Sequence, residues 1–439
     1  MIFCCSLEEN HFFRAQSRKK HRRTFLKKAL IVSFDFMRKG ETSPSLAIGS
    51  LITHAKADVR YGHEFCIEHV FFNMLDPLDR SLSYFMEKIL DKCMQYNTIL
   101  IAVYIWSECL VVKLIRRLRE IGYQGKIVLG GYQITYGREA LKHEYPECDI
   151  FISSYGENSL VESIFMARPK YPIHLNRQVD FNQLASPYLF GEIDVIFGQR
   201  AVRLETKRGC PYRCSFCAHQ DLTGNNVYKI KTSRVIEELE WFNSRRVGKI
   251  NILDPVFNTG NEYLGILEEM VRIKLSSMIS LQSRFELIRG KKGDYFIWLV
   301  EKLNVVLEFG VQTIVEEECR AINRSIDLGH VRNIFRLLKE KGISYEVSLI
   351  YGLPNQTVDS FKKSIDFILE SGPKKVVAYP LMLLKGTKLY KQKQKWNLEE
   401  KILGDFQIPT VVSGNTFNED AWLKMHEIAN DLEISYTDT

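Results

Sequence analysis

Three cysteines stand close together near the middle of the chain, Cys210, Cys214 and Cys217, in the pattern CxxxCxxC. Cysteine thiolates at short spacings of this kind are typical ligands of iron–sulfur clusters. Three thiolates do not complete a tetrahedral zinc site, but they can hold three irons of a [4Fe–4S] cluster and leave the fourth iron open. An alternative stays open, because His219 extends the pattern to CxxxCxxCxH, which is compatible with a zinc knuckle.

Four segments that follow these cysteines place polar residues at the ends of expected strands. The strand pattern at 305–311 runs into Gln312, and Asn323-Arg324 lies near the start of a later helix. The segment SLIYGLPNQT at 348–357 leads from a strand through a Gly-Pro turn into a helix, and AYPLMLLKGT occupies 378–387. Each polar residue alone is equally well explained as an ordinary strand end or helix cap.

The cysteine loop and these segments, taken in this order, resemble the radical S-adenosylmethionine (SAM) superfamily. The resemblance implies that the open iron binds SAM and that an electron from the cluster cleaves it to start radical chemistry. It also implies that Phe216 packs beside the adenine, and that Gln312 and Arg324 contact the ribose and carboxylate of SAM. An Arg fork suits a carboxylate. Asp254, at the end of the second strand, would help to hold the SAM amino group.

Two positions depart from the pattern of the superfamily. Ser348 stands where related enzymes often carry Asp, which puts a ribose contact there in doubt, and Gln282 stands where Glu is common. The predicted SAM-binding residues are Phe216, Asp254, Gln282, Gln312, Arg324 and Ser348.

Strand and helix patterns alternate through the first part of the chain, over 26–168. Apolar strand-sized runs at 29–34, 65–72, 98–104, 126–131 and 149–153 are separated by amphipathic helical segments. This alternation predicts a Rossmann-like parallel sheet with helices on both faces. Ligands of such sheets lie at the carboxyl ends of strands, where Gly130-Gly131 and Tyr155-Gly156-Glu157 fall.

This first part resembles the cobalamin-binding domain that precedes the radical SAM domain in one large subfamily. The similar segments are SPSLAIGSL at 43–51, VLGGYQIT at 128–135 and SYGENSLVESI at 154–164. The resemblance implies cobalamin contacts at Gly130, Gly131, Gly156 and Glu157. The DxHxxG motif that supplies a cobalt-binding His in cobalamin-dependent mutases is absent. A domain that has lost its cofactor is the alternative, because fold alone does not imply function.

A second series of strands and helices begins at about residue 201. Strands are expected at 202–206, 249–253, 279–282, 305–311, 344–350 and 375–379, which predicts a partial (β/α)6 TIM-type barrel with function at the carboxyl ends of its strands. The expected domains are a basic extension at 1–25, the Rossmann-like domain at 26–168, a linker at 169–200, the barrel at 201–390 and a tail at 391–439. Four tail residues either cap the barrel mouth or join its core: Trp396, Phe406, Trp422 and Met425.

Composition narrows the class of protein. The chain has 439 residues, is 45% hydrophobic and carries a net charge of +7. No apolar run approaches the roughly 18 residues of a membrane span, and no signal peptide is evident, so a cytoplasmic protein is expected. The seven other cysteines lack paired spacing, which argues against a disulfide framework. The basic run from Arg14 to Lys28 is more typical of a solvated leader than of an RNA-binding arm.

The resulting functional prediction is a radical SAM enzyme acting on a small molecule, with cobalamin-dependent methyl transfer to an unactivated carbon or phosphorus. Its cofactors would be a [4Fe–4S] cluster, SAM and cobalamin, and its electron donor a flavodoxin or ferredoxin; neither membrane nor nucleic acid is expected. One alternative is a cobalamin-independent radical SAM enzyme with a degenerate first domain. Another is a metal-stabilised binding protein without activity. No side chain is identified as a general acid or base.

Overall fold

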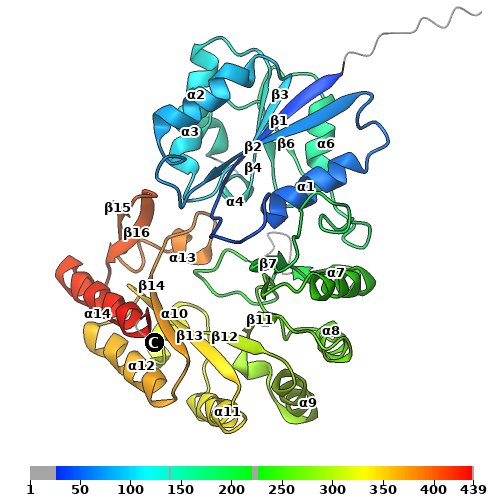
Figure 1. Cartoon of the computed structure of the whole chain (residues 1–439). Coiled ribbons are helices and arrows are strands. Elements are labelled where there is room, and N and C mark those ends of the chain that lie inside the picture. Colours follow the sequence, from blue (N-terminus) through cyan, green and yellow to red (C-terminus); the bar gives the residue numbers. More distant parts are fainter. Residues whose placement is uncertain (1–25, 138–139, 220–225, 438–439) are drawn as a thin grey trace, which may run out of the picture.

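The computed structural model describes residues 26–137, 140–219 and 226–437, which form two parallel β-sheets with helices around each (Figure 1). The first sheet lies above the second in this view, and the part of the chain that joins the two sheets runs between them. Most of the predicted basic run, from Arg14 to Arg23, lies outside the described residues.

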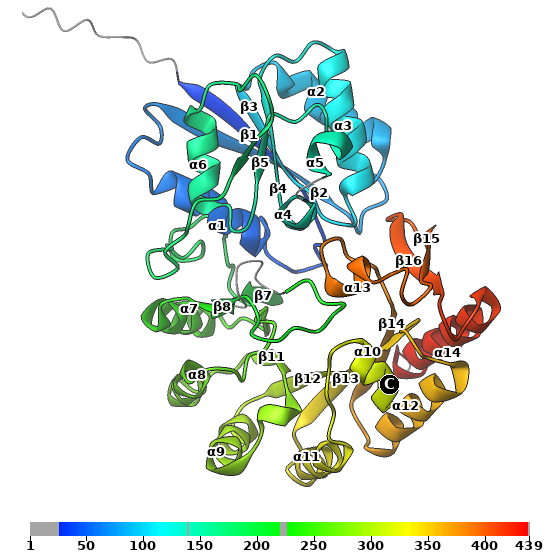
Figure 2. The same ribbon diagram turned by 180° about the vertical axis from the view of Figure 1, so that it is seen from behind.

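The first sheet has six parallel strands in the order β2-β1-β3-β4-β5-β6. Helices α1 and α6 pack together on one face, and α2 and α3 pack together on the other (Figure 2). The strands are β1 (Lys27–Asp35), β2 (Phe65–Asn73), β3 (Thr98–Ala102), β4 (Lys126–Gly130), β5 (Ile150–Ile152) and β6 (Ile173–Leu175). The helices are α1 (Leu46–Lys56), α2 (Leu82–Cys93), α3 (Glu108–Glu120), α4 (Tyr132–Tyr136), α5 (Leu141–Glu144) and α6 (Glu157–Phe165).

This sheet follows the sequence pattern closely, because parallel strands covered on both faces read as continuous apolar runs. Residues 29–34 of β1 are all buried. The predicted linker at 169–200 differs from the structure at one point, since it contains β6, which pairs with β5 as the sixth strand. Three residues are too few to show a period, so no strand pattern can be read there.

The second sheet also has six parallel strands, in the order β14-β13-β12-β11-β10-β7, and it does not close into a full barrel within the described residues. Helices line its outer face (Figure 1). The strands are β7 (Ala201–Leu204), β10 (Lys249–Ile252), β11 (Met278–Ser283), β12 (Val305–Gln312), β13 (Ser344–Tyr351) and β14 (Lys375–Pro380). The outer helices are α7 (Thr232–Ser244), α8 (Glu262–Arg272), α9 (Gly290–Glu301), α11 (Leu328–Glu340) and α12 (Val358–Glu370).

Successive residues of the barrel strands alternate between two environments, the core beneath the helices and the interior of the barrel. In β12 the odd-numbered residues, such as Leu307 and Phe309, are buried in the core beneath the helices, whereas Glu308, Gly310 and Gln312 are only partly buried. Successive side chains of a strand point to opposite faces. The barrel interior is therefore polar, as suits a ligand cavity.

Short elements complete the barrel and carry the loops at its mouth: β8 (Lys207–Arg208), β9 (Tyr228–Lys229), the 3₁₀ helix η1 (Phe285–Leu287), α10 (Glu316–Ala321) and α13 (Lys388–Lys391). The C-terminal part forms an antiparallel hairpin of β15 (Glu399–Leu403) and β16 (Ile408–Ser413), then α14 (Glu419–Thr437), which packs on β14 and α12. Trp422 and Met425 are buried in the barrel core. Phe406, at the hairpin turn, instead lies 5.0 Å from the ring of Phe36 in the first part of the chain.

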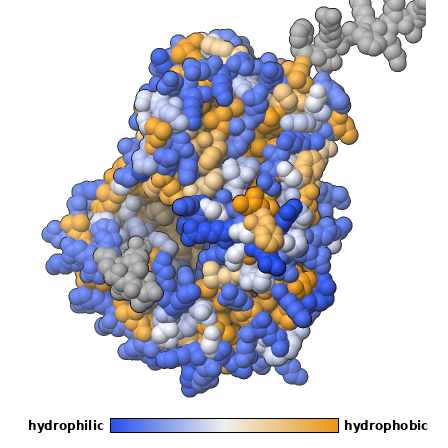
Figure 3. Space-filling model, viewed as in Figure 1, coloured by the Kyte–Doolittle hydropathy of each residue, from blue (hydrophilic) through white to orange (hydrophobic). Residues whose placement is uncertain are grey.

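Among the described residues, no helix combines the length and the hydrophobicity that crossing a membrane requires. On the face shown in Figure 3, hydrophobic residues are scattered among hydrophilic ones.

Candidate functional site

The cysteine loop follows the first barrel strand, as the sequence predicts. Backbone bonds fix it to the far side of the barrel: Ser215 N donates to Ile322 O at 2.8 Å, and Leu389 N donates to Ser215 O at 2.8 Å. Gly209, just before the first cysteine, has φ +87°, and a Cβ there would collide with the carbonyl oxygen of Asn226. Glycine at 209 therefore lets the chain turn into the loop without strain.

All three cysteines of the loop line one cavity of about 330 Å³ inside the barrel mouth. None of them forms a disulfide. Burial, with the two neighbouring thiols, raises the pKa of Cys217 to about 11, so an unligated Cys217 is a neutral thiol near pH 7. A free nucleophile would need the opposite shift. Ligation fits better, because a metal deprotonates a coordinating thiol outright.

The geometry of these thiols argues against a single zinc ion. In the described part of the chain, no three His, Cys, Asp or Glu side chains gather closely enough to hold one metal ion. His219 is thus not grouped with Cys210, Cys214 and Cys217 at the spacing that one metal ion needs. A cube-shaped cluster binds one iron per thiolate, so its thiolates stand further apart than those around one ion. The donor set thus fits a cluster better than zinc.

Five of the six residues predicted to contact SAM line the same cavity as the cysteines. They come from the cysteine loop, from β11 to β13 and from the segment after α10, which are distant in sequence but adjacent in the sheet. These five are Phe216, Gln282, Gln312, Arg324 and Ser348.

Gln312 is held in an unusual backbone conformation at the end of β12. Its φ is +71°, and the pairing with β13 is irregular between Gly310 and Gln312. A Cβ at Gly310 would overlap the side-chain nitrogen of Gln312. Strained backbone and bulges of this kind gather at functional sites, where they aim a side chain. Gly310 thus provides the space in which the Gln312 amide lies.

Arg324 lines the cavity and carries a buried donor without a partner. Its side chain is only 7% exposed, and its nearest carboxylate is Glu286, whose Oε1 lies 3.7 Å from Nη2. Its Nε is buried without a hydrogen-bond partner. Buried donors are normally satisfied, so an orphan in a cavity indicates a missing acceptor. A carboxylate would supply one, since guanidinium binds carboxylates in a fork.

The structure gives the sixth residue, Asp254, a different set of partners. Its fully buried carboxylate accepts hydrogen bonds from Thr206 N at 2.7 Å, from Thr206 Oγ1 and from Lys207 N at 3.2 Å. Burial raises the pKa of Asp254 to about 6, and the Lys207 ammonium opposes that shift. Asp254 therefore anchors the backbone that leads into the cysteine loop, and it is not among the residues lining the cavity.

A second cavity, of about 280 Å³, lies between the first sheet and helices α1 and α6. Apolar side chains from four strands and two helices form its walls, among them Ile31, Ile48, Leu100, Val128 and Leu160. Its rim is at the carboxyl ends of the strands, beside the point where the strand order reverses between β1 and β3. Ligands of parallel sheets bind at such switch points. We call this cavity the apolar slot.

All four residues predicted for a cofactor in the first domain line the apolar slot: Gly130, Gly131, Gly156 and Glu157. Gly131 has φ +95°, and a Cβ there would lie 2.8 Å from Val103 O. Gly130 differs, because its Cβ would meet nothing closer than 3.7 Å. Of the two glycines, only Gly131 has a backbone conformation that needs glycine. That conformation lets β4 turn into α4.

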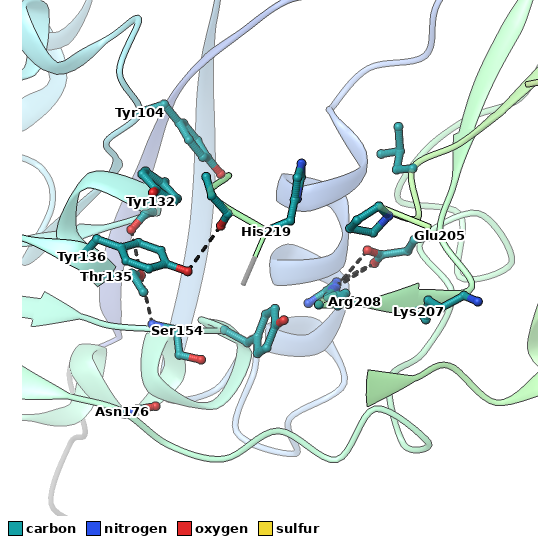
Figure 4. Close-up of a pocket in the computed structure, with 16 residues that line it drawn as sticks. Tyr104, Tyr132, Thr135, Tyr136, Ser154, Asn176, Glu205, Lys207, Arg208 and His219 are labelled. Carbon is teal, nitrogen blue, oxygen red and sulfur yellow. Dashed lines mark hydrogen bonds and ion pairs between the residues drawn. The ribbon is translucent and has the colours of Figure 1, made fainter. Parts of the chain in front are cut away.

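A third cavity, of about 320 Å³, adjoins the other two, and Figure 4 shows the residues that line it. It shares Tyr104, Gly131 and Arg208 with the apolar slot, and it shares His219 and Pro255 with the cysteine cavity. We call it the middle cavity. The three cavities are thus neighbours, which share wall residues from the first sheet to the cysteine loop.

A buried ion pair at this junction was not predicted from the sequence. Arg208 of β8 contacts Glu157 of α6 at 2.6 Å and Glu205 at 2.6 Å, as Figure 4 shows for Glu205. Burial alone would raise the pKa of Glu157, but the Arg208 guanidinium lowers it. The pair joins the first domain to the strand that precedes the cysteines. No sequence signal connects residues 51 positions apart, so only the fold reveals it.

Comparison with known proteins identifies the second part of the chain. Residues 204–368 match the model of the Radical SAM superfamily, whose cofactors are a [4Fe–4S] cluster and SAM. The cobalamin-dependent radical SAM methyltransferase TokK of Streptomyces tokunonensis is 23% identical over 361 residues, which are 74% of this chain and 51% of TokK. The chain spans about half the length of the curated relatives that it matches first.

Two solved structures share the fold over most of this chain. TsrM of Kitasatospora setae, a radical SAM methyltransferase with cobalamin and a [4Fe–4S] cluster bound, gives a TM-score of 0.64 at 15% identity, covering 93% of this chain and 89% of TsrM. The cobalamin-dependent SAM radical enzyme OxsB gives 0.68 at 15% identity, covering 92% of this chain and 66% of OxsB. The likeness includes both sheets, so the Rossmann-like domain and the partial barrel occur together in these proteins too. Residues 204–368 of this chain therefore form a radical SAM domain, and the chain as a whole shares its fold with TsrM and OxsB.

Proposed function

We propose that this chain is a cobalamin-dependent radical SAM methyltransferase that methylates an unactivated carbon or phosphorus of a small molecule. The row of adjacent cavities carries this proposal, because the middle cavity shares wall residues with the apolar slot in the first domain and with the cavity of the three thiols in the second. When bound, the cluster would supply the electron for reductive cleavage of SAM, and cobalamin would carry the methyl group. TsrM, whose structure holds both cobalamin and a [4Fe–4S] cluster, has this same pair of folds.

In the barrel, residues of this chain bind the cluster and SAM and hold them in a fixed orientation. Cys210, Cys214 and Cys217 hold the cluster, and Phe216 beside them offers an aromatic surface to the adenine. The orphan Nε of Arg324 receives the SAM carboxylate. The Gln312 amide, aimed by the bulge in β12, receives a hydroxyl of the ribose. The fixed arrangement positions the reacting centre, and the cofactor supplies the radical chemistry.

In the first domain, the residues fit a large, partly apolar cofactor without a metal-binding His. The apolar slot is lined by aliphatic side chains, and no described histidine is among its walls. Gly131 lets backbone approach a ligand at the rim, and Tyr104 of the middle cavity stands at the same rim. The aliphatic walls of the slot and the backbone at Gly131 would hold a cobalamin there, and when bound it would supply methyl-carrier chemistry.

Retention of cobalamin tests this proposal. The protein would be reconstituted anaerobically with iron, sulfide and hydroxocobalamin and then desalted. Ala47→Trp introduces a large side chain at the mouth of the slot from an exposed position of α1. Ala57→Trp, at the exposed end of the same helix and away from the slot, is its matched control.

We expect stoichiometric cobalamin absorbance in the wild type and in Ala57→Trp, and its loss in Ala47→Trp. Iron and sulfide content should be equal in all three. A wild type that retains its cluster and no cobalamin would contradict the proposal in favour of a cobalamin-independent radical SAM enzyme. One zinc in place of iron and sulfide would reject both.

A further inference from the structure

Gln312 lies at the centre of a strained turn at the end of β12. Thr313 N donates to Val311 O at 2.9 Å, which closes a three-residue γ-turn around Gln312, whose φ is +71°. Turns of this hand are rare, because the central residue takes a backbone conformation that L side chains avoid. Such strain persists only where the surrounding structure holds the turn in place.

The contacts that hold this turn run through Thr313 to a buried acid. Thr313 is fully buried, and its hydroxyl donates to Oε2 of Glu318 in α10 and accepts from Val315 N at 3.1 Å. Glu318 is also fully buried, and it is not among the residues that line the cysteine cavity. The residue that follows Gln312 is thus fixed from outside the cavity.

The same carboxyl group reaches the neighbouring strand through Gln356. Nε2 of Gln356 donates to Glu318 Oε2 at 3.4 Å. Oε1 of Gln356 accepts from Gly352 N at 2.7 Å and from Leu353 N at 3.1 Å, so Gln356 fixes the chain as it leaves β13. Glu318 therefore ties the end of β13 to the turn that ends β12.

The helix that carries Glu318 also contacts the cysteine loop. The Ser215 hydroxyl donates to the carbonyl oxygen of Ala321, the last residue of α10, at 3.2 Å. Arg324 N donates to Cys319 O at 2.9 Å, which anchors the arginine on the same helix. One short helix thus joins the cysteine loop, Arg324 and the turn at Gln312.

Stability alone does not require an acid at position 318. Burial raises the pKa of Glu318, and its hydrogen-bonding neighbours Ser360, Thr313 and Gln356 only partly oppose that shift. Burying a carboxyl group costs free energy that burying an apolar side chain of similar size does not. Hydrogen bonds, however, have preferred directions, so the carboxyl group fixes geometry as an apolar side chain would not.

We propose that Glu318 is a positioning residue of the SAM site, which holds Gln312 in its strained turn from outside the cavity. This inference rests on the proposed function, because Gln312 is there assigned to the ribose of SAM. Without the carboxyl group the turn can relax toward an ordinary backbone conformation. The Gln312 amide then leaves the place where a ribose hydroxyl would meet it.

A mutant cycle on SAM affinity tests the inference. Dissociation constants for SAM would be measured by calorimetry on the protein reconstituted with iron and sulfide, without substrate. The variants are Glu318→Leu, Glu318→Gln, Gln312→Ala and the double variant Gln312→Ala/Glu318→Leu. Glu238→Leu is the matched control, because Glu238 of α7 is an equally buried glutamate of the barrel that does not line the cysteine cavity.

We expect Glu318→Leu to weaken SAM binding about tenfold, as Gln312→Ala does, since each removes about one hydrogen bond to SAM. Glu318→Gln keeps an oxygen acceptor for Thr313 and should bind SAM as the wild type does. The double variant should bind SAM no more weakly than Gln312→Ala, because Glu318 acts through Gln312. Glu238→Leu leaves Arg234 without its partner, so it should lower the melting temperature and leave SAM affinity unchanged.

Unchanged SAM affinity in Glu318→Leu, a further loss in the double variant, or an equal loss in Glu238→Leu would each overturn the inference. Where Glu318→Leu does not fold, Thr313→Val takes its place, because it removes only the hydroxyl that is bonded to Glu318. Thr313→Val should also weaken SAM binding, and unchanged affinity there would equally overturn the inference. A wild type that holds its cluster and binds no SAM would instead reject the proposed function.

Discussion

The ion pair between Arg208 and Glu157 makes the sharpest prediction about stability, because it is buried and joins the two domains. The Glu157 side chain is 2% exposed and that of Arg208 is 14% exposed. Replacing Glu157 with Gln keeps its volume and removes its charge, leaving a buried guanidinium with one carboxylate fewer. Removing one partner of a buried pair costs roughly 3–5 kcal/mol. Glu205 still contacts Arg208, so we expect about 3 kcal/mol, at the lower end of that range.

Thermal unfolding followed by fluorescence measures this loss. For a unit of 150–250 residues, each kcal/mol lowers the melting temperature by about 2–4 °C, so Glu157→Gln should melt roughly 6–12 °C below the wild type. Glu162→Gln is the matched control, because Glu162 lies on the same helix and pairs with a well-exposed Arg177. Exposed pairs contribute little, and this control should melt with the wild type. If Glu157→Gln also melts with the wild type, the buried pair does not stabilise the junction.

Three further outcomes follow from the site. Gly310→Ala should weaken SAM binding in calorimetry by about tenfold, because the new Cβ displaces the amide of Gln312; unchanged affinity would remove Gln312 from the SAM site. Gly131→Ala should cost about 1–3 kcal/mol in denaturant unfolding, since its φ is +95°, whereas Gly130→Ala should be nearly silent; equal effects would contradict the backbone argument. Because burial raises the pKa of Asp254 to about 6, its contribution to stability is fully present below its unfolded pKa, near 4, and is lost as pH rises through 6. Asp254→Asn should remove that slope from the pH dependence of unfolding, and a slope that persists would reject it.

The architecture could be predicted from the sequence because both sheets are parallel and buried. Strands such as β3 (Thr98–Ala102) read as short apolar runs between amphipathic helices, and the strand limits were predicted to within a few residues. The cysteine loop was predicted because its chemistry is local: three thiols within eight residues need no knowledge of the fold. The strand β6, with only three residues after a proline, carried no such pattern.

The rest of the site depends on pairings between distant residues. The partners of Asp254 lie 47 and 48 positions away, so the sequence shows an acid at a strand end and not the backbone that it anchors. Glu318 and Gln356 stand 38 positions apart and meet only because β12 and β13 are neighbours in the sheet. Arg208 meets Glu157 through the packing of two domains. Such contacts depend on which strands and domains lie side by side, and the hydrophobic pattern of the sequence does not show that.

The central claim, that Cys210, Cys214 and Cys217 hold a cluster with an open iron for SAM, is tested most directly by electron paramagnetic resonance. The protein would be reconstituted anaerobically, reduced with dithionite, and measured before and after SAM is added, so that no substrate is required. The account predicts the signal of a reduced [4Fe–4S] cluster that changes shape when SAM binds. A protein that shows no such signal, or a cluster signal that SAM leaves unchanged, would contradict it.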